Sequence, residues 1–254
     1  MRTVTIAEET IPQYRVPLFE ALQRTLEDHR VHLRVAHGRP GRNFAQRLDA
    51  PGLTWGESLP QCNFRFRDHE LVWLDCRRAI RKTDLVIVSQ EIRQVSNLAL
   101  WALQEAGCIR LGLWGHGRDF SKPSDRGLTE RVKRAMSRRP HWWFAYNQLS
   151  ARTVSGFGYP AERISVLMNS TDTELLRETR NGTGLDQIRE LRKISEIGEG
   201  PVGLYLGAMD PIKHLSYLLD AARHIRRMLP TFELMMIGAG PELPALRETP
   251  SGDP

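Results

Sequence analysis

The sequence has no apolar run long enough to cross a bilayer. Runs such as LVIV at 85–88 fall far short of the roughly 20 residues that a transmembrane helix requires. The opening residues, MRTVTIAEET, also lack the basic segment and the long apolar segment of a signal peptide. We therefore expect a cytoplasmic protein.

Cysteine is scarce, and motifs for nucleic-acid binding are missing. Cys62, Cys76 and Cys108 have no metal-site spacing and are odd in number, which fits a reducing compartment and predicts buried structural thiols. The sequence contains no zinc-finger spacing, no RNP-like aromatic motif and no basic zipper. Nucleic acid is therefore not an expected partner.

Positive charge is in excess. Lysine and arginine number 36 against 30 aspartates and glutamates, which gives a net charge of +6. Such a surface attracts phosphate-bearing substrates or an anionic membrane face, and a solvated surface without a partner is an equal alternative. The basic segment at 131–140 is a candidate for contact with anionic lipid, although an ordinary solvated helix face is the stronger interpretation.

Short apolar runs alternate with helical segments, which predicts an α/β fold with a mostly parallel sheet covered on both faces. Residues 38–69 have no clear period and indicate a loop or a short hairpin region. The predicted strands lie at 4–7, 31–36, 85–89, 109–114, 142–146 and 164–168. The predicted helices lie at 16–28, 70–82, 93–106, 126–138 and 148–157.

A polar stretch at 169–200 predicts a junction, so we expect one domain at 1–172 and another at 173–254. The second domain contains a strand–helix–strand unit, whose elements are predicted at 202–207, 214–229 and 232–238, followed by a short helix at 241–248. One such unit leaves sheet edges and helix faces exposed. We therefore expect the second domain to be incomplete.

The second domain carries a set of motifs at fixed order. Gly207 ends a strand, Lys213 lies in the loop that follows, the next helix reads LLDAA at 218–222, and the next strand ends in GAGP at 238–241. This order resembles the start of the donor domain of glycosyltransferase family 4.

Three upstream segments extend the resemblance over nearly the whole chain. ISVLMNSTDTEL at 164–175, with Asn169 and Asp172, resembles the interdomain signature of the family, while IPQYRVPLFEAL at 11–22 and LWGHG at 113–117 resemble its N-terminal segments. The resemblance implies a GT-B-type fold, with a complete Rossmann-like N-terminal domain on the acceptor side and the first part of a second Rossmann-like domain for the donor.

The sequence departs from the family at two points. Ala208 stands where the family commonly has an arginine that contacts the donor diphosphate. The paired glutamates that the family spaces as E-x7-E are absent from the 254 residues. Both departures put turnover by this chain alone in question.

The resemblance implies a retaining transfer of a hexose from a UDP- or GDP-linked donor to a glycan or glycolipid acceptor, in the synthesis of surface polysaccharide or glycolipid. Such an enzyme works in the cytoplasm, with peripheral contact at the inner membrane face as an option. GT-B enzymes usually act without a divalent metal, so no cofactor is expected. Lys213 would stabilise the departing diphosphate, while Gly207 and Gly240 would let the backbone approach the donor.

The resemblance also implies roles for residues of the first domain. His116, between two glycines after a predicted strand, would be the catalytic contact to the transferred sugar or the acceptor. Tyr14 and Arg15, in the first loop between strand and helix, would bind the acceptor through a hydroxyl or phosphate. A satisfied loop histidine and a surface arginine are the alternatives for His116 and Arg15.

Two other functions stay open. The missing glutamates and Ala208 favour a truncated, catalytically inactive homologue that acts as a binding module. A GT-B-shaped sugar-nucleotide epimerase is the third hypothesis, based on shared architecture alone.

Overall fold

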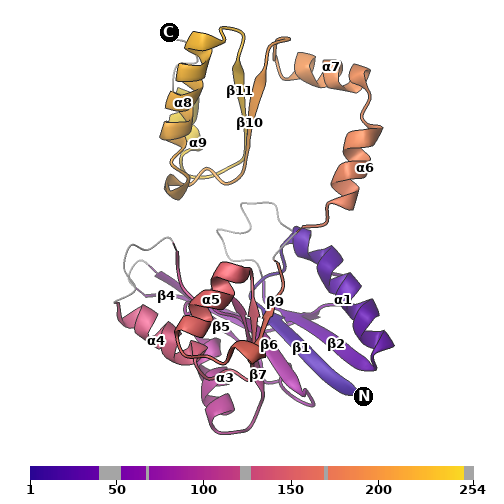
Figure 1. Cartoon of the computed structure of the whole chain (residues 1–254), viewed down its shortest axis with the longest axis vertical. Helices are drawn as coiled ribbons and strands as arrows, with labels where there is room; N and C mark the ends of the chain where they lie inside the picture. The colour runs from indigo at the N-terminus through magenta and orange to yellow at the C-terminus, as the bar shows by residue number, and fades with distance from the viewer. Residues whose placement is uncertain (40–52, 67–68, 121–126, 169–170, 249–254) are drawn as a thin grey trace. The chain divides into compact units, whose positions relative to one another are not determined.

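The computed structural model describes residues 1–39, 53–66, 69–120, 127–168 and 171–248. These residues form two compact units that divide between Asp172 and Thr173 (Figure 1). Asn169 of the interdomain signature lies outside the described residues.

The first unit is built on a seven-stranded sheet in which every pair of neighbouring strands is parallel. The strand order is β3-β2-β1-β6-β7-β8-β9, so the direction of progression reverses between β1 and β6. The strands are β1 (Arg2–Glu8), β2 (Val31–His37), β3 (Glu57–Ser58), β6 (Leu85–Ser89), β7 (Leu111–Gly115), β8 (Trp142–Ala145) and β9 (Ile164–Val166). A reversal of this kind opens a crevice at the carboxyl ends of the strands, where α/β proteins bind ligands.

Helices pack on both faces of this sheet, because alternate side chains of each strand point to opposite faces. Ile6 and Ile87 belong to a core cluster with Phe19 of α1, whereas Ala7 and Val88 belong to a second cluster on the other face with residues of α3 and α5. The helices are α1 (Val16–Asp28), α3 (Ser96–Glu105), α4 (Leu128–Ser137) and α5 (Gln148–Gly156), with short 3-10 turns η1 (Gln13–Arg15) and η2 (Ala161–Arg163). The predicted α/β class is confirmed.

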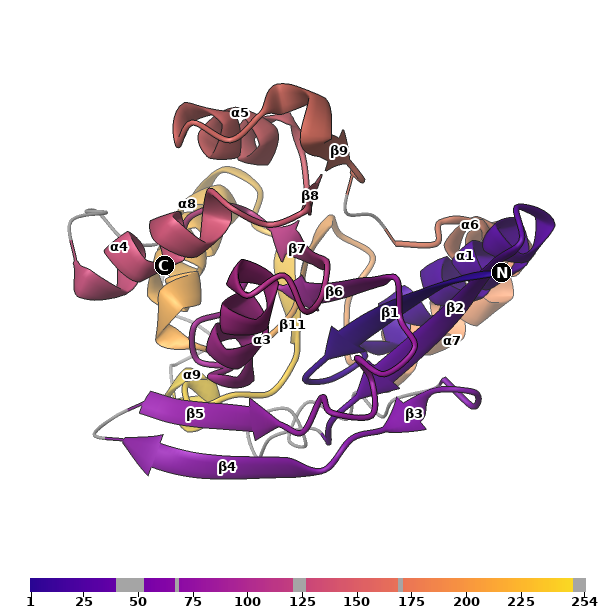
Figure 2. The ribbon, with the colours of Figure 1, turned by 90° about the horizontal axis from the view of Figure 1, so that it is seen from below.

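The predicted helix at 70–82 is wrong, because its first part is a strand. Strand β5 (His69–Leu74) pairs antiparallel with β4 (Gln61–Phe66), and the pair lies beside α3 (Figure 2). Val72 and Leu74 are buried while Trp73 between them is exposed, which is the two-residue period of a strand. Residues 76–82 then form turns.

The second unit contains a parallel pair of strands, β10 (Val202–Leu206) and β11 (Glu233–Ile237), joined by α8 (Leu215–Met228). This strand–helix–strand unit was predicted from the sequence. The turn η3 (Pro211–Lys213) precedes α8, and α9 (Leu243–Glu248) follows β11. The polar stretch before β10 holds two helices that we did not predict, α6 (Glu174–Gly182) and α7 (Leu185–Ile194).

The expectation of buried thiols is wrong for two of the three cysteines. Cys76 is buried, but Cys62 and Cys108 are exposed, because Cys62 lies on the two-stranded β4–β5 sheet and Cys108 in the turn after α3. None of the helices in the described part of the chain combines the length and apolar character needed to cross a bilayer.

Candidate functional site

The candidate site of the first unit is a pocket at the carboxyl ends of β6, β7 and β8. It has a volume of about 450 Å³ and lies beside the point where the strand order reverses. Its lining residues are Ser89, Gln90, Glu91, Trp114, Gly115, His116, Arg118, Asp119, Phe120, Lys133 and Tyr146. Topology and shape therefore indicate the same place for a ligand.

His116 is the residue directly after β7, and its exposed ring lines this pocket. The Ser150 hydroxyl donates to Asn147 Oδ1 at 3.0 Å and lies 3.1 Å from His116 Nδ1. The hydroxyl oxygen can therefore accept from Nδ1–H, which leaves Nε2 of a neutral ring as a hydrogen-bond acceptor. Burial and the neighbouring Lys133 lower the pKa of His116, which favours that neutral ring.

The loop that carries His116 is held by the Gln90 side chain and by close packing at Gly117. The Gln90 side chain accepts from the Gly117 backbone N–H at 2.9 Å and donates to the Gly117 carbonyl at 3.1 Å. Gly117 has φ +82°, and a Cβ there would lie 2.8 Å from Val154. A glycine is thus required at this position both by the backbone conformation and by the packing.

The Tyr146 ring holds His116 from the other side. The two ring centroids are 4.5 Å apart at an interplanar angle of 66°. Arg15 donates to the Tyr146 hydroxyl at 2.7 Å, and its guanidinium lies 4.9 Å from the centroid of the Trp114 ring. Arg15 therefore orients the aromatic side chains that frame His116.

A buried carboxylate supports Arg15 in turn. Glu8, the last residue of β1, forms an ion pair with Arg15 at 3.6 Å and accepts from the Ser89 hydroxyl at 2.6 Å. Burial raises the pKa of Glu8 to about 7, against the opposing effect of Arg15 and Ser89. A chain of contacts thus leads from Glu8 through Arg15 and Tyr146 to His116.

The two predicted acceptor residues differ in their surroundings. Tyr14 is 42% exposed, whereas Arg15 is 7% exposed and engaged by Glu8 and Tyr146. The structure brings Arg15 and His116 together through Tyr146. Their roles toward an acceptor stay predictions.

The predicted donor residues lie in the second unit, at the carboxyl edge of its strand pair. Gly207 directly follows β10 and donates to the Ile237 carbonyl at 3.0 Å. Lys213 is exposed at the end of η3, ahead of α8. Gly240 lies after β11, where a Cβ would be 2.4 Å from the Met209 carbonyl oxygen, so close backbone packing accounts for a glycine there.

Sequence reasoning missed Glu8, Ser89, Tyr146, Arg118 and Lys133. A signal existed for the first two, because Glu8 follows the strand predicted at 4–7 and Ser89 ends the strand predicted at 85–89, and the carboxyl ends of parallel strands meet at one edge of a sheet. Tyr146 is the last residue of the strand predicted at 142–146. Arg118 and Lys133 had no comparable signal, since basic residues are frequent in this sequence.

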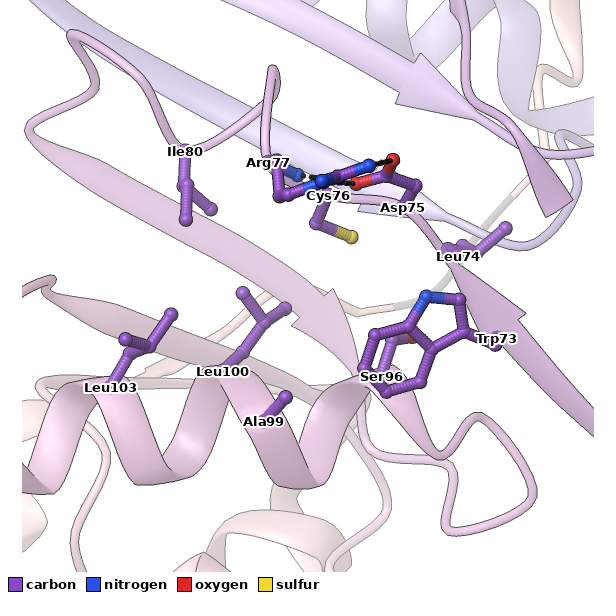
Figure 3. A pocket seen from close by; sticks show the side chains of 10 residues that line it. All are labelled: Trp73, Leu74, Asp75, Cys76, Arg77, Ile80, Ser96, Ala99, Leu100 and Leu103. Atoms are coloured by element: carbon purple, nitrogen blue, oxygen red, sulfur yellow. Dashed lines mark hydrogen bonds and ion pairs between the residues drawn. The ribbon is translucent and has the colours of Figure 1, made fainter.

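A second pocket in the first unit is unsuited to catalysis. It has a volume of about 260 Å³ and lies between β5, the turns after it and α3. Figure 3 shows the Cys76 sulfur facing the apolar side chains of α3, with the Asp75–Arg77 ion pair beside it. Burial raises the pKa of the Cys76 thiol to about 11, so this thiol is protonated and a poor nucleophile at neutral pH. Among the described residues, no three His, Cys, Asp or Glu side chains are placed to hold a metal ion.

No family model and no curated protein sequence matches the chain. Solved structures do match it. Anabaena HepE in complex with UDP and glucose aligns with a TM-score of 0.62 at 16% identity, over 98% of this chain and 64% of that one.

Two further solved structures align similarly. The UDP-GlcNAc 2-epimerase from Neisseria meningitidis, bound to UDP-GlcNAc, gives a TM-score of 0.51 at 15% identity, over 93% of this chain and 65% of that one. S. aureus MnaA with UDP gives a TM-score of 0.57 at 14% identity, over 98% of this chain and 65% of that one. The chain thus spans somewhat less than two-thirds of the length of these structures. At such identities the likeness shows the fold alone, and the chain therefore has an α/β fold of the GT-B type.

Proposed function

We propose that this chain belongs to a retaining glycosyltransferase similar to family 4, which moves a sugar from a UDP- or GDP-hexose to a glycan or glycolipid acceptor. One observation carries the proposal: Gly207, Lys213 and Gly240 lie at the carboxyl edge of the β10–β11 pair, in a fold shared with proteins solved with UDP. That edge is where parallel sheets of this class bind nucleotides. Such an enzyme acts in the cytoplasm, at the inner membrane face when its acceptor is a glycolipid.

The chemistry assigns a role to Lys213. Breaking the bond between the sugar and the diphosphate leaves negative charge on the β-phosphate, and a nearby cation or helix N-terminus stabilises that charge. Lys213 supplies the cation, and the N-terminus of the 14-residue helix α8 follows directly. His116, with its free Nε2, accepts a hydrogen bond from a sugar or acceptor hydroxyl. Neither role requires a metal.

Two observations favour other functions. The solved structures that match include UDP-GlcNAc 2-epimerases, which favours an epimerase as the second candidate. Ala208 stands where the family that the chain resembles commonly has an arginine for the donor diphosphate, which favours a binding module without turnover.

A single NMR experiment separates the three functions. The chain is incubated with UDP-glucose or UDP-GlcNAc, with and without a glycan acceptor mixture, and the nucleotide and anomeric protons are followed. A transferase releases UDP and gives a glycoside whose anomeric configuration matches that of the donor. An epimer formed without UDP release contradicts the proposal in favour of the epimerase, and saturable binding without any product contradicts it in favour of the binding module.

A further inference from the structure

The pocket around His116 contains two cationic side chains without an anionic partner. Arg118 and Lys133 both line it, and neither forms an ion pair within the described part of the chain. The Arg118 guanidinium lies 4.7 Å from the centroid of the Phe120 ring, and its Nε is buried without a hydrogen-bond partner. Two cations that line one pocket and form no ion pair there favour an anionic ligand.

The carboxylates of the same pocket are already engaged. Glu91 forms an ion pair with Arg93 at 2.8 Å. Asp119 also has an interaction partner, so neither carboxylate is unpaired. His116 adds no third positive charge, because burial and Lys133 lower its pKa. Beside these carboxylates, the pocket thus offers two cations and one neutral hydrogen-bond acceptor.

This combination suits a phosphate next to a hydroxyl. The planar guanidinium of Arg118 offers paired donors that match the geometry of phosphate oxygens. A phosphate dianion also balances the positive charge of both side chains, whereas a single carboxylate balances the charge of one. Arg15, expected from the sequence to reach a phosphate, is instead occupied by Glu8 and Tyr146. The volume of about 450 Å³ has room for a hexose phosphate.

We propose that the acceptor carries a phosphate group, which Arg118 and Lys133 bind while His116 contacts the acceptor hydroxyl. The inference rests on the proposed function and names the chemistry of its acceptor. A soluble sugar phosphate and the headgroup of a phosphorylated lipid share this chemistry.

The test is isothermal titration of the full chain, in a phosphate-free buffer, with glucose 1-phosphate and with glucose. We expect binding of the phosphate and not of glucose, and a loss of at least tenfold in affinity in both Lys133→Gln and Arg118→Gln. The matched control is Arg131→Gln, which removes an exposed charge from the same helix and leaves affinity within twofold. Equal weakening in the control, or equal binding of glucose, would overturn the inference.

Vesicles distinguish the two sources of phosphate. The chain is sedimented with phosphatidylcholine vesicles that contain or lack phosphatidic acid. Binding that depends on Lys133 and phosphatidic acid, together with no binding of glucose 1-phosphate, assigns the phosphate to a lipid and supports the inference. Binding to neither phosphate compound by the folded chain overturns it.

Titration with UDP separates this inference from the proposed function. If UDP binding requires Lys213 and not Lys133, the proposed donor site is supported, whatever the titrations with glucose 1-phosphate and the vesicle experiment show. If UDP binding also requires Lys133, the pocket holds the donor diphosphate and the inference is wrong. If UDP binds neither the parent chain nor any variant, that result counts against the proposed function. The titrations with glucose 1-phosphate and glucose still test whether the pocket around His116 binds a phosphate.

Discussion

Glu8 is the residue whose ionisation we expect to influence stability most. Its pKa in the folded protein, about 7, exceeds the ordinary value of 4.5 because the carboxyl group is buried. A raised pKa means that the protonated form is favoured by folding, so this contribution is complete below pH 4.5 and is lost as pH rises through about 7. The 2.5-unit difference corresponds to roughly 3 kcal/mol.

We therefore expect Glu8→Gln to be as stable as the parent near pH 4.5 and more stable near pH 8, by up to roughly 3 kcal/mol. Urea denaturation at several pH values measures this. Glu20→Gln, on the exposed face of α1, is the control and should leave the pH dependence unchanged. A constant difference between Glu8→Gln and the parent at all pH values would contradict the expected burial.

The second prediction for a single residue concerns the hydrogen bond between Arg15 and the Tyr146 hydroxyl. Tyr146→Phe keeps the ring against His116 but leaves a buried guanidinium donor of Arg15 without its acceptor, which costs about 1–3 kcal/mol. Tyr14→Phe, at an exposed ring next to the same arginine, should cost less than about 0.5 kcal/mol. Equal effects in urea denaturation would mean that the Arg15–Tyr146 contact contributes nothing.

At the scale of elements, the period of apolar residues predicted most strands and helices correctly. The failures have physical reasons. The strand β5 has a two-residue period of burial, but its exposed position between Val72 and Leu74 is the apolar Trp73, so the run LVWL at 71–74 shows no alternation of apolar and polar residues. Helix α7 does carry an apolar stripe, because Leu185, Ile188, Leu191 and Ile194 recur at three-residue spacing, but neither α6 nor α7 buries a side chain. The many charged residues of this stretch led us to interpret it as a junction.

The loop between β7 and α4 gives an element-scale prediction. Gly117→Ala places a side chain at φ +82° and within 2.8 Å of Val154, which should destabilise the first unit by more than about 1 kcal/mol. Gly156→Ala, at the end of α5 with no atom within 4 Å of its Cβ, is the matched control and should be neutral or slightly stabilising. Thermal unfolding of both variants gives the comparison; similar melting temperatures would argue against the described loop conformation.

At the scale of the whole molecule, the two units differ in how much apolar surface they bury. The central strands β6 and β7 of the first unit are almost entirely buried, whereas Leu204, Leu206 and Ile237 of β10 and β11 are exposed. Met209 and Leu215 are the buried hydrophobic residues among the described positions of the second unit. The number of elements led us to expect exposed sheet edges and helix faces in the second unit, but the pocket around His116 depended on side-chain placement that no period encodes.

Because the first unit buries more apolar surface than the second, we expect the two units to unfold in separate transitions. All 6 tryptophans lie before Asp172, so tryptophan fluorescence reports on the first unit, while far-ultraviolet circular dichroism reports on the helices of both. We expect the circular dichroism signal to begin falling at a lower urea concentration than the fluorescence signal, because burial provides most of the stability. Coincident curves would show that the units unfold together.

The most direct test of the central claim, that this chain has a nucleotide-sugar site at the carboxyl edge of β10 and β11, is titration of UDP and GDP into the folded chain and two lysine variants. We expect saturable binding of at least one nucleotide, lost in Lys213→Ala and kept in Lys193→Ala, an exposed lysine on α7. Absence of binding by the folded parent, or equal affinity in all three proteins, would contradict the assignment.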